Sequence, residues 1–159
     1  MKKILTAAAS GVLGLAAGGS AVYSSMNKLL KKSREDGGKM SEFYQVLVPW
    51  LTLRQEGRNL KEYFINHDYH SVAIYGIKEL GERLCCELNG TEINVAYAID
   101  KNSGSDFMGM QVYSPKQRLE KVDAVVVTAI HYFDEIEQEL AGAVDADIVS
   151  IEDVVFELI

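Results

Sequence analysis

The chain has 159 residues, a length that suits one domain with an appended segment. Its composition is that of a globular protein, with 48% hydrophobic and 25% charged residues. A net charge of -7 argues against a nucleic-acid partner, because phosphate contacts are built on clustered Lys and Arg. The charge is uneven, since the first 40 residues are basic and the C-terminal half is acidic.

Cysteine and histidine usage excludes two further classes of site. Cys85 and Cys86 are adjacent, so a bond between them would be strained, and the sequence predicts no disulfide framework. His67, His70 and His131 are scattered, and no Cys or His spacing resembles a metal-ligand set. We therefore predict a reducing compartment and no metal.

The first predicted element is an apolar helix within residues 1–32. Residues 4–27 carry no charge, and a helix of that length can cross a bilayer core of about 30 Å. It can be a membrane anchor, a signal peptide cleaved after Gly19-Ser20-Ala21, or a helix that lies on the membrane surface. The basic cluster after the run favours an anchor with a cytoplasmic C-terminal domain, by the positive-inside rule. Export after cleavage is the alternative location.

A polar linker is predicted at residues 33–40, where a Gly-Gly pair interrupts the pattern. A helical lead-in is expected at residues 41–70, with Ser41 as the cap of its first helix and a second helix at about 59–66. Trp50 lies in an apolar stripe at helical spacing, which indicates core packing rather than a ligand platform.

Residues 71–159 alternate between strands and helices. The apolar runs lack polar alternation, which is typical of parallel strands buried on both faces. We predict an α/β domain, a small doubly wound, Rossmann-like parallel sheet of five strands in the order 3-2-1-4-5. The predicted strands are 72–75, 93–99, 111–113, 122–128 and 148–151, and the predicted helices are 79–88, a short one opening at Ser114-Pro115, 133–140 and a last one from Glu152.

A glycine turn after the first strand is the main functional signal. The dinucleotide fingerprint is G-x-G-x-x-G between a strand and a helix. Gly76 fits its first position, where the chain turns tightly, and Gly81 fits its third, where helix packs on strand. Lys78 replaces the middle glycine, so it either crowds a pyrophosphate or pairs with a phosphate by charge.

Two strand ends complete the predicted cleft. Asp100 follows the second strand, the position at which an acidic residue accepts hydrogen bonds from ribose hydroxyls in nucleotide-binding domains. The alternative interpretation is that Asp100 is simply a polar residue where the strand passes into a loop. Thr128 ends the fourth strand on the same side and is a candidate ligand contact. His131, Tyr132 and Asp134 lie just beyond, but the sequence offers them no catalytic set, and a helix start is the preferred interpretation.

These segments resemble a known group of domains. Ile74–Leu84, Ala98–Asn102 and Asp123–Thr128 are similar to the Rossmann-like, NAD(P)- or nucleotide-sugar-binding domains of bacterial surface-polysaccharide biosynthesis proteins. The resemblance covers roughly residues 58 to 159 and implies a role near nucleotide sugars or NAD(P), without implying catalysis.

Three functions are compatible with this pattern. The favoured one is a membrane-tethered, cytoplasmic module that binds a nucleotide or nucleotide sugar through Gly76, Lys78, Gly81, Asp100 and Thr128, with a glycan-synthesis protein as partner and no catalytic activity of its own. The second is an interaction protein with a degenerate Rossmann domain that binds no ligand. The third is an NAD(P)-dependent sugar-modifying enzyme, for which the chain leaves no room for a substrate domain.

Overall fold

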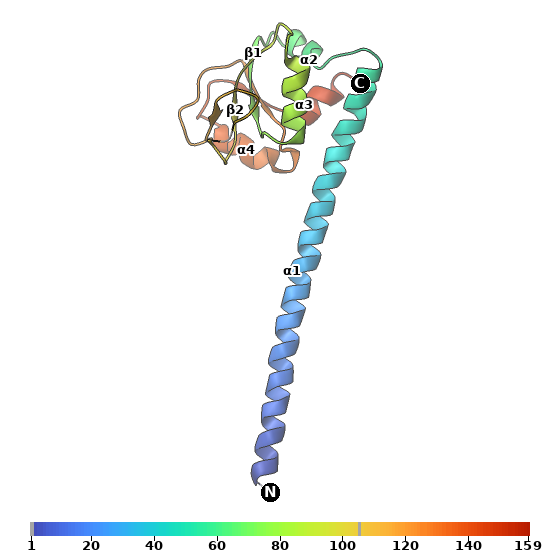
Figure 1. Cartoon of the computed structure of the whole chain (residues 1–159), viewed down its shortest axis with the longest axis vertical. Coiled ribbons are helices and arrows are strands. Elements are labelled where there is room, and N and C mark those ends of the chain that lie inside the picture. Colours follow the sequence, from blue (N-terminus) through green and yellow to red (C-terminus); the bar gives the residue numbers. More distant parts are fainter. Residues whose placement is uncertain (1, 105) are drawn as a thin grey trace. The chain divides into compact units, whose positions relative to one another are not determined.

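The computed structural model describes residues 2–104 and 106–159, with side chains described from Ser24 onward except at position 105. The chain divides into two compact units, residues 1–40 and residues 41–159 (Figure 1). The helices are α1 (Lys2–Gln55), α2 (Lys61–Asn66), α3 (Glu79–Leu88), η1 (a 3-10 turn, Ile130–Tyr132), α4 (Phe133–Leu140) and α5 (Ile151–Phe156), and the strands are β1 (Ser71–Tyr75), β2 (Asn94–Ile99), β3 (Val112–Tyr113), β4 (Ala124–Val127) and β5 (Asp147–Ser150).

The sheet confirms the predicted α/β class and strand order. Its five strands are all parallel and run in the order β3-β2-β1-β4-β5. Parallel neighbours need crossover connections, and the chain supplies α3 between β1 and β2 and α4 between β4 and β5. The strand order reverses between β1 and β4, at the centre of the sheet.

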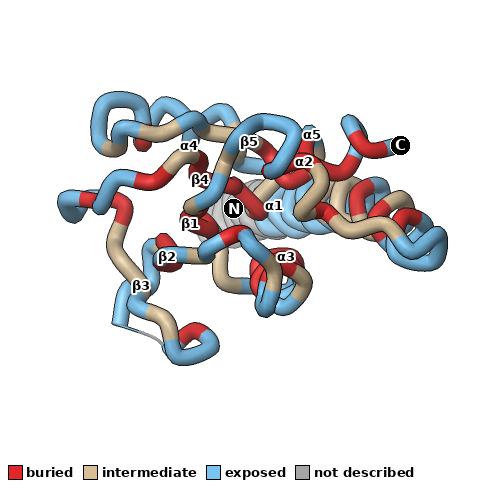
Figure 2. The backbone as a smooth tube through the Cα atoms, turned by 90° about the horizontal axis from the view of Figure 1, so that it is seen from above, coloured by how far each residue is buried: buried red, intermediate tan, exposed pale blue. Residues whose placement is uncertain are grey.

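Both faces of the sheet are covered. Successive residues of β1 point to opposite sides, so Val72 and Ile74 enter one apolar cluster while Ala73 and Tyr75 enter the other. The first cluster also holds buried residues of α2, α3, α5 and the C-terminal part of α1, and the second holds those of α4. Figure 2 shows buried backbone in the central strands β1, β2 and β4, which lie between α3 and α4. The uninterrupted apolar runs in the sequence reflect this two-sided burial.

Trp50 belongs to the core, as its helical spacing predicted. Its side chain is only 4% exposed, and its indole N–H donates to Glu87 Oε2 at 2.6 Å. The other carboxylate oxygen of Glu87 accepts the Leu60 backbone N–H at 2.7 Å and lies 3.7 Å from Arg54. One nearly buried carboxylate of α3 therefore fastens α1 and the start of α2.

The segment between β3 and β4 corrects one expectation. Ser114-Pro115 opens a turn rather than a helix, with the Gln117 N–H donating to Ser114 O at 3.0 Å. The Gln117 side chain accepts the Ser114 N–H at 2.8 Å and closes that turn from outside. The bond satisfies a backbone donor that would have no intrahelical partner at a helix start either, so it is compatible with a turn that does not continue as a helix.

Residues 33–41 are helical, where the sequence indicated a linker followed by a new cap at Ser41. Glycine in a helix costs only about 1 kcal/mol relative to alanine, so the Gly37-Gly38 pair weakens a helix without ending it. The boundary between the two compact units still falls at 40/41. Among the described residues, no helix has the length and apolarity needed to cross a membrane. The span expected at residues 4–27 lies mostly outside the residues whose side chains are described.

Replacing Glu87 by alanine should lower the free energy of unfolding of the 41–159 unit by about 1–3 kcal/mol, because the Trp50 and Leu60 donors lose their shared acceptor inside the fold. Trp50 is the only tryptophan of the chain, so its fluorescence during chemical denaturation reports the transition. The matched control is Glu137→Ala, at an exposed helical glutamate of α4. Equal effects of the two substitutions would contradict the role given to Glu87.

Candidate functional site

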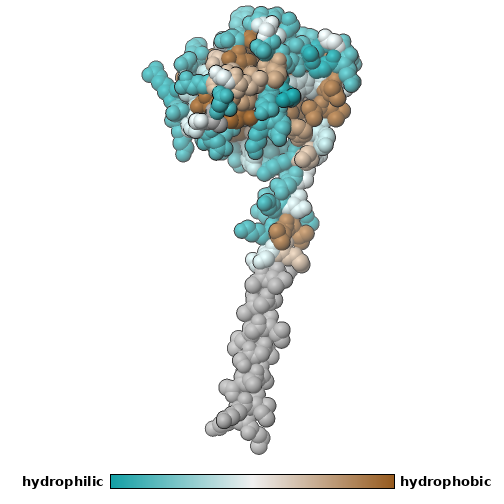
Figure 3. All heavy atoms as spheres, in the orientation of Figure 1, coloured by the Kyte–Doolittle hydropathy of each residue, from teal (hydrophilic) through white to brown (hydrophobic). Residues whose placement is uncertain are grey.

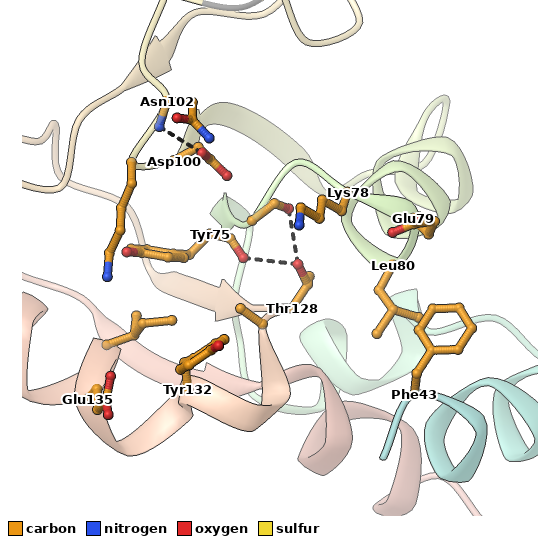
Figure 4. Close-up of a pocket in the computed structure, with 14 residues that line it drawn as sticks. Phe43, Tyr75, Lys78, Glu79, Leu80, Asp100, Asn102, Thr128, Tyr132 and Glu135 are labelled. Atoms are coloured by element: carbon orange, nitrogen blue, oxygen red, sulfur yellow. Dashed lines mark hydrogen bonds between the residues drawn. The ribbon is translucent and has the colours of Figure 1, made fainter. Parts of the chain in front are cut away.

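The carboxyl ends of β1, β2 and β4 surround a pocket of about 530 Å³ (Figure 4). This is the place predicted for a ligand, the edge of the sheet at which the strand order reverses. The volume lies within the range of small-molecule sites. Its walls are formed by Phe43, Tyr75, Gly76, Lys78, Glu79, Leu80, Asp100, Lys101, Asn102, Thr128, Ala129, Tyr132, Glu135 and Ile136.

The turn after β1 requires glycine at position 76. Gly76 has a φ of +96°, a conformation that L side chains rarely adopt. A Cβ there would also lie 2.6 Å from Thr128 Oγ1. The Gly76 N–H donates to Ile99 O at 2.9 Å, so the turn is tied to the end of β2.

Gly81 lets α3 lie directly against this turn. A Cβ at position 81 would come 2.0 Å from the carbonyl oxygen of Gly76 and 3.5 Å from the Ile74 side chain. The residue is buried and is not part of the pocket wall. Its position matches the predicted role of the third glycine, which is close packing of helix on strand.

Thr128 fixes the same turn from the β4 side. Its backbone N–H donates to Tyr75 O at 2.9 Å, and its hydroxyl lies 3.0 Å from both Tyr75 O and Gly76 O, to which it can donate (Figure 4). The side chain is buried at 7% exposure, although it borders the pocket. The Thr128 hydroxyl therefore donates its proton to a backbone carbonyl rather than to a ligand. Toward a bound molecule it can act only as a hydrogen-bond acceptor.

Asp100 reaches the pocket from the end of β2. Its Oδ1 accepts the Asn102 N–H at 2.8 Å, which shapes the loop that leaves the strand (Figure 4). The two interpretations of Asp100 are thus compatible, because the carboxylate caps a turn and borders the pocket with its neighbour Lys101. Three carboxylates and two amines face the cavity: Glu79, Asp100 and Glu135, and Lys78 and Lys101.

Lys78 occupies the position before the first residue of α3, in extended conformation and with no side-chain cap on the helix. Its side chain is exposed and borders the pocket. The first-turn N–H groups of α3 point toward this end of the helix, which favours an anion there, while Glu79 and Glu82 in the same turn offset part of that attraction.

Two tyrosines, Tyr75 and Tyr132, border the pocket. Burial and the nearby carboxylates of Glu139 and Asp100 raise the pKa of Tyr75 to about 12, so its hydroxyl stays protonated near neutral pH. That hydroxyl lies 3.5 Å from Glu139 Oε2, a long hydrogen bond. Tyr132 lies at the end of η1 and is partly exposed.

Of the group singled out beyond β4, the pocket wall includes Tyr132 but neither His131 nor Asp134. The His131 ring Nδ1 is 3.1 Å from the carboxylate of Glu42 on α1, and Asp134 lies in the first turn of α4, the helix start that the sequence indicated. The described wall contains no histidine or cysteine. In the described part of the chain, no three His, Cys, Asp or Glu side chains are grouped as a metal site.

Sequence reasoning missed part of the wall. Phe43 comes from α1, and Leu80, Glu135 and Ile136 come from α3 and α4. The helical spacing around Phe43 predicted a core residue. Nothing in that stretch of sequence indicated that its side chain lies beside the carboxyl ends of strands more than 30 residues further along the chain. Lys101 follows Asp100 directly, so its presence at the same strand end was predictable.

A sequence-profile comparison assigns residues 68–149, more than half of the chain, to a family described as C2185-like, N-terminal. The chain belongs to the C2185-like N-terminal family. The family segment contains β1 to β4 and most of β5, and with them Gly76, Lys78, Gly81, Asp100 and Thr128. Phe43 lies outside the segment. No curated protein matches the chain significantly.

Replacing Gly81 by alanine should destabilise the 41–159 unit by about 1–3 kcal/mol or more, because the new methyl group overlaps the Gly76 carbonyl oxygen unless α3 moves away from β1. The change is measured as the shift of the denaturation midpoint followed by Trp50 fluorescence. Gly38→Ala is the control, since a Cβ there meets nothing within 4 Å. Wild-type stability of the Gly81 variant would show that α3 does not need this close approach.

Proposed function

We propose that residues 41–159 form a binding module for a nucleotide-type small molecule, NAD(P) or a nucleotide sugar, held in the pocket at the carboxyl end of the sheet. The observation that carries this proposal is the convergence of the Gly76 turn, the start of α3 and Asp100 on one pocket of about 530 Å³. The turn and the helix start belong to one segment and Asp100 to another, and the two segments match the phosphate and the ribose of a nucleotide.

The phosphate group belongs at the start of α3. The backbone there has no side-chain cap, and Lys78 adds a positive charge beside it. The positive φ of Gly76 and the missing side chain of Gly81 bring the helix end close to the pocket floor. Lys78 then contacts the phosphate by charge, in place of the backbone approach that a middle glycine would allow.

The ribose belongs beside Asp100, whose carboxylate can accept hydrogen bonds from the two ribose hydroxyls. The apolar wall is suited to a base or sugar ring, with Phe43, Leu80, Ala129 and Ile136 providing it. Binding is favoured over catalysis. With a pKa of about 12, Tyr75 is far from the range in which a phenol serves as a base at neutral pH.

A degenerate domain that docks to a partner without a ligand is the second candidate. The observation that favours it is the engagement of Thr128 and Asp100 with the backbone, since both side chains then have structural roles that need no ligand. An NAD(P)-dependent sugar-modifying enzyme would need a set of catalytic side chains, and the described pocket wall does not contain such a set.

Ligand binding is tested by thermal denaturation of the full chain in mild detergent, with NAD⁺, NADP⁺, UDP-glucose and coenzyme A as separate probes. At least one probe should raise the melting temperature, since a ligand at 100 times its Kd adds about 2.7 kcal/mol of stability. Asp100→Asn should weaken binding by about 10- to 100-fold, the loss of a charged hydrogen-bond acceptor. The control is Asp106→Asn, an exposed aspartate on the same loop and outside the pocket wall. No shift with any probe would favour the degenerate domain.

The module is further proposed to be tethered to a membrane by residues 4–27, with its C-terminal unit in the cytoplasm and a glycan-synthesis protein as partner. The support is the uncharged run followed by Lys28, Lys31, Lys32 and Arg34. A role in polysaccharide synthesis rests on the resemblance of the glycine turn and strand ends described above.

Fractionation tests the tether. The full chain should sediment with membranes, resist alkaline extraction and dissolve in detergent, because an inserted apolar helix is released only when the bilayer is dissolved. A mature N-terminus near Val22, found by N-terminal sequencing, would instead show a cleaved signal peptide and an exported domain.

A further inference from the structure

A second hollow, of about 330 Å³, lies beside the ligand pocket, and the two share part of their walls. Tyr132 and Glu135 border both of them. On α1, Glu42 borders the second hollow, and the next residue, Phe43, borders the pocket. We call it the His131 hollow. The acidic and basic side chains of its wall are Glu42, His131, Asp134, Glu135 and Glu152.

His131 is the side chain of this wall that can carry positive charge, because the described wall includes no lysine or arginine. The four carboxylates around it come from three helices, α1, α4 and α5. Carboxylates gathered around one hollow repel each other. A protonated imidazole offsets part of that repulsion, whereas a neutral one does not.

The direct contact of His131 is with Glu42. The ring Nδ1 lies 3.1 Å from both carboxylate oxygens, although the two residues are 89 positions apart in the chain. A neutral ring donates to this carboxylate only in the tautomer that has its proton on Nδ1. A protonated ring always donates from Nδ1, and its positive charge strengthens the bond. Protonation therefore tightens the link between η1 and α1.

This contact is open to solvent. The side chains of His131 and Glu42 are each 37% exposed. Figure 3 shows hydrophilic side chains over much of the visible surface of residues 41–159, with apolar ones gathered in patches. Histidine is the side chain whose charge normally changes between about pH 5 and pH 8. The strength of the contact therefore depends on the pH of the surrounding solution.

The link acts at the wall of the ligand pocket. Phe43 is half-buried, packs on the core and borders the pocket (Figure 4). The bond between Trp50 and Glu87 fastens α1 about two turns further along, whereas the contact between Glu42 and His131 fastens it directly beside Phe43. At the other end of the contact, His131 is followed by Tyr132, which also borders the pocket.

Protonation of His131 favours an anionic ligand in two ways. A tighter contact keeps Phe43 in place in the pocket wall. Positive charge on His131 also reduces the negative potential of the nearby carboxylates, and Glu135 borders the pocket itself. A nucleotide carries negative phosphate groups, so both effects strengthen its binding as the pH falls. Because the pair is partly exposed, solvent screening limits the gain.

We propose that His131 is a pH-sensitive clamp on the pocket. Its protonated ring holds Glu42, and with it Phe43, so that the pocket binds its anionic ligand more tightly at mildly acidic than at mildly basic pH. This inference rests on the proposed nucleotide site. It gives His131 a positioning role, without contact to the ligand.

The clamp is tested without ligand, by hydrogen–deuterium exchange of the full chain in mild detergent at about pH 5.5 and about pH 8, corrected for intrinsic exchange rates. The amides of residues 41–46 should be about two- to fivefold more protected at the lower pH, which is the contribution of a partly exposed ion pair. His131→Gln should remove the difference. His131→Lys keeps a positive charge at both pH values and should keep the higher protection at both.

The control is His70→Gln, at a 73% exposed histidine just before β1, and it should leave the difference unchanged. Equal protection at the two pH values in the wild-type chain, or a difference that survives His131→Gln, overturns the proposal.

Ligand binding is then compared at the same two pH values, with UDP-glucose and NAD⁺ as probes. Neither has a terminal phosphate, so the charge of their phosphate groups stays constant over this range. A probe that binds should bind about two- to fivefold more tightly at the lower pH, and His131→Gln should abolish that gain. Equal affinity at both pH values overturns the clamp but leaves the nucleotide site standing. Conversely, pH-dependent protection of residues 41–46 with no probe bound at either pH supports the clamp and refutes the nucleotide site.

Discussion

The approach of α3 to the turn after β1 is the contact on which the pocket depends. With no side chain at Gly81, the helix lies so close that a single methyl group would overlap the Gly76 carbonyl oxygen. Gly76 turns the chain with a φ of +96°, and Thr128 holds the two carbonyl groups of that turn from the neighbouring strand. Together the three residues hold the start of α3 against the turn after β1.

That position brings unlike groups together. The uncapped start of α3 and Lys78 favour an anion, while Asp100 and Glu135 contribute negative charge from other walls. A ligand with phosphate at one end and hydroxyl groups at the other would use both signs of charge. Burial, together with the carboxylates of Glu139 and Asp100, raises the pKa of Tyr75 and keeps its hydroxyl protonated near neutral pH, which makes it a hydrogen-bond donor rather than a base.

The nearly buried carboxylate of Glu87 holds the lead-in helices on the sheet. Glu87 accepts from Trp50 and Leu60, so it satisfies two donors that would otherwise be buried without partners. This link brings Phe43 of α1 within reach of the pocket, although Phe43 lies outside the segment that defines the family. The family segment provides the turn and the strand ends, and the lead-in adds an apolar wall.

The sequence by itself determined the parallel sheet, its strand order and the edge where the pocket lies, because two-sided burial requires apolar runs and the glycine turn requires Gly76 and Gly81. It did not determine the turn at Ser114, the helix through Gly37, or the partners of Thr128 and Asp100. The free energy of each of these conformations differs from that of its alternative by about the contribution of one hydrogen bond or one helical glycine, roughly 1 kcal/mol. The turn at Ser114 and the loop at Asp100 are held by local bonds. The Thr128 bonds to the turn after β1 and the place of Phe43 in the pocket wall join segments distant in sequence, and only the tertiary structure contains them.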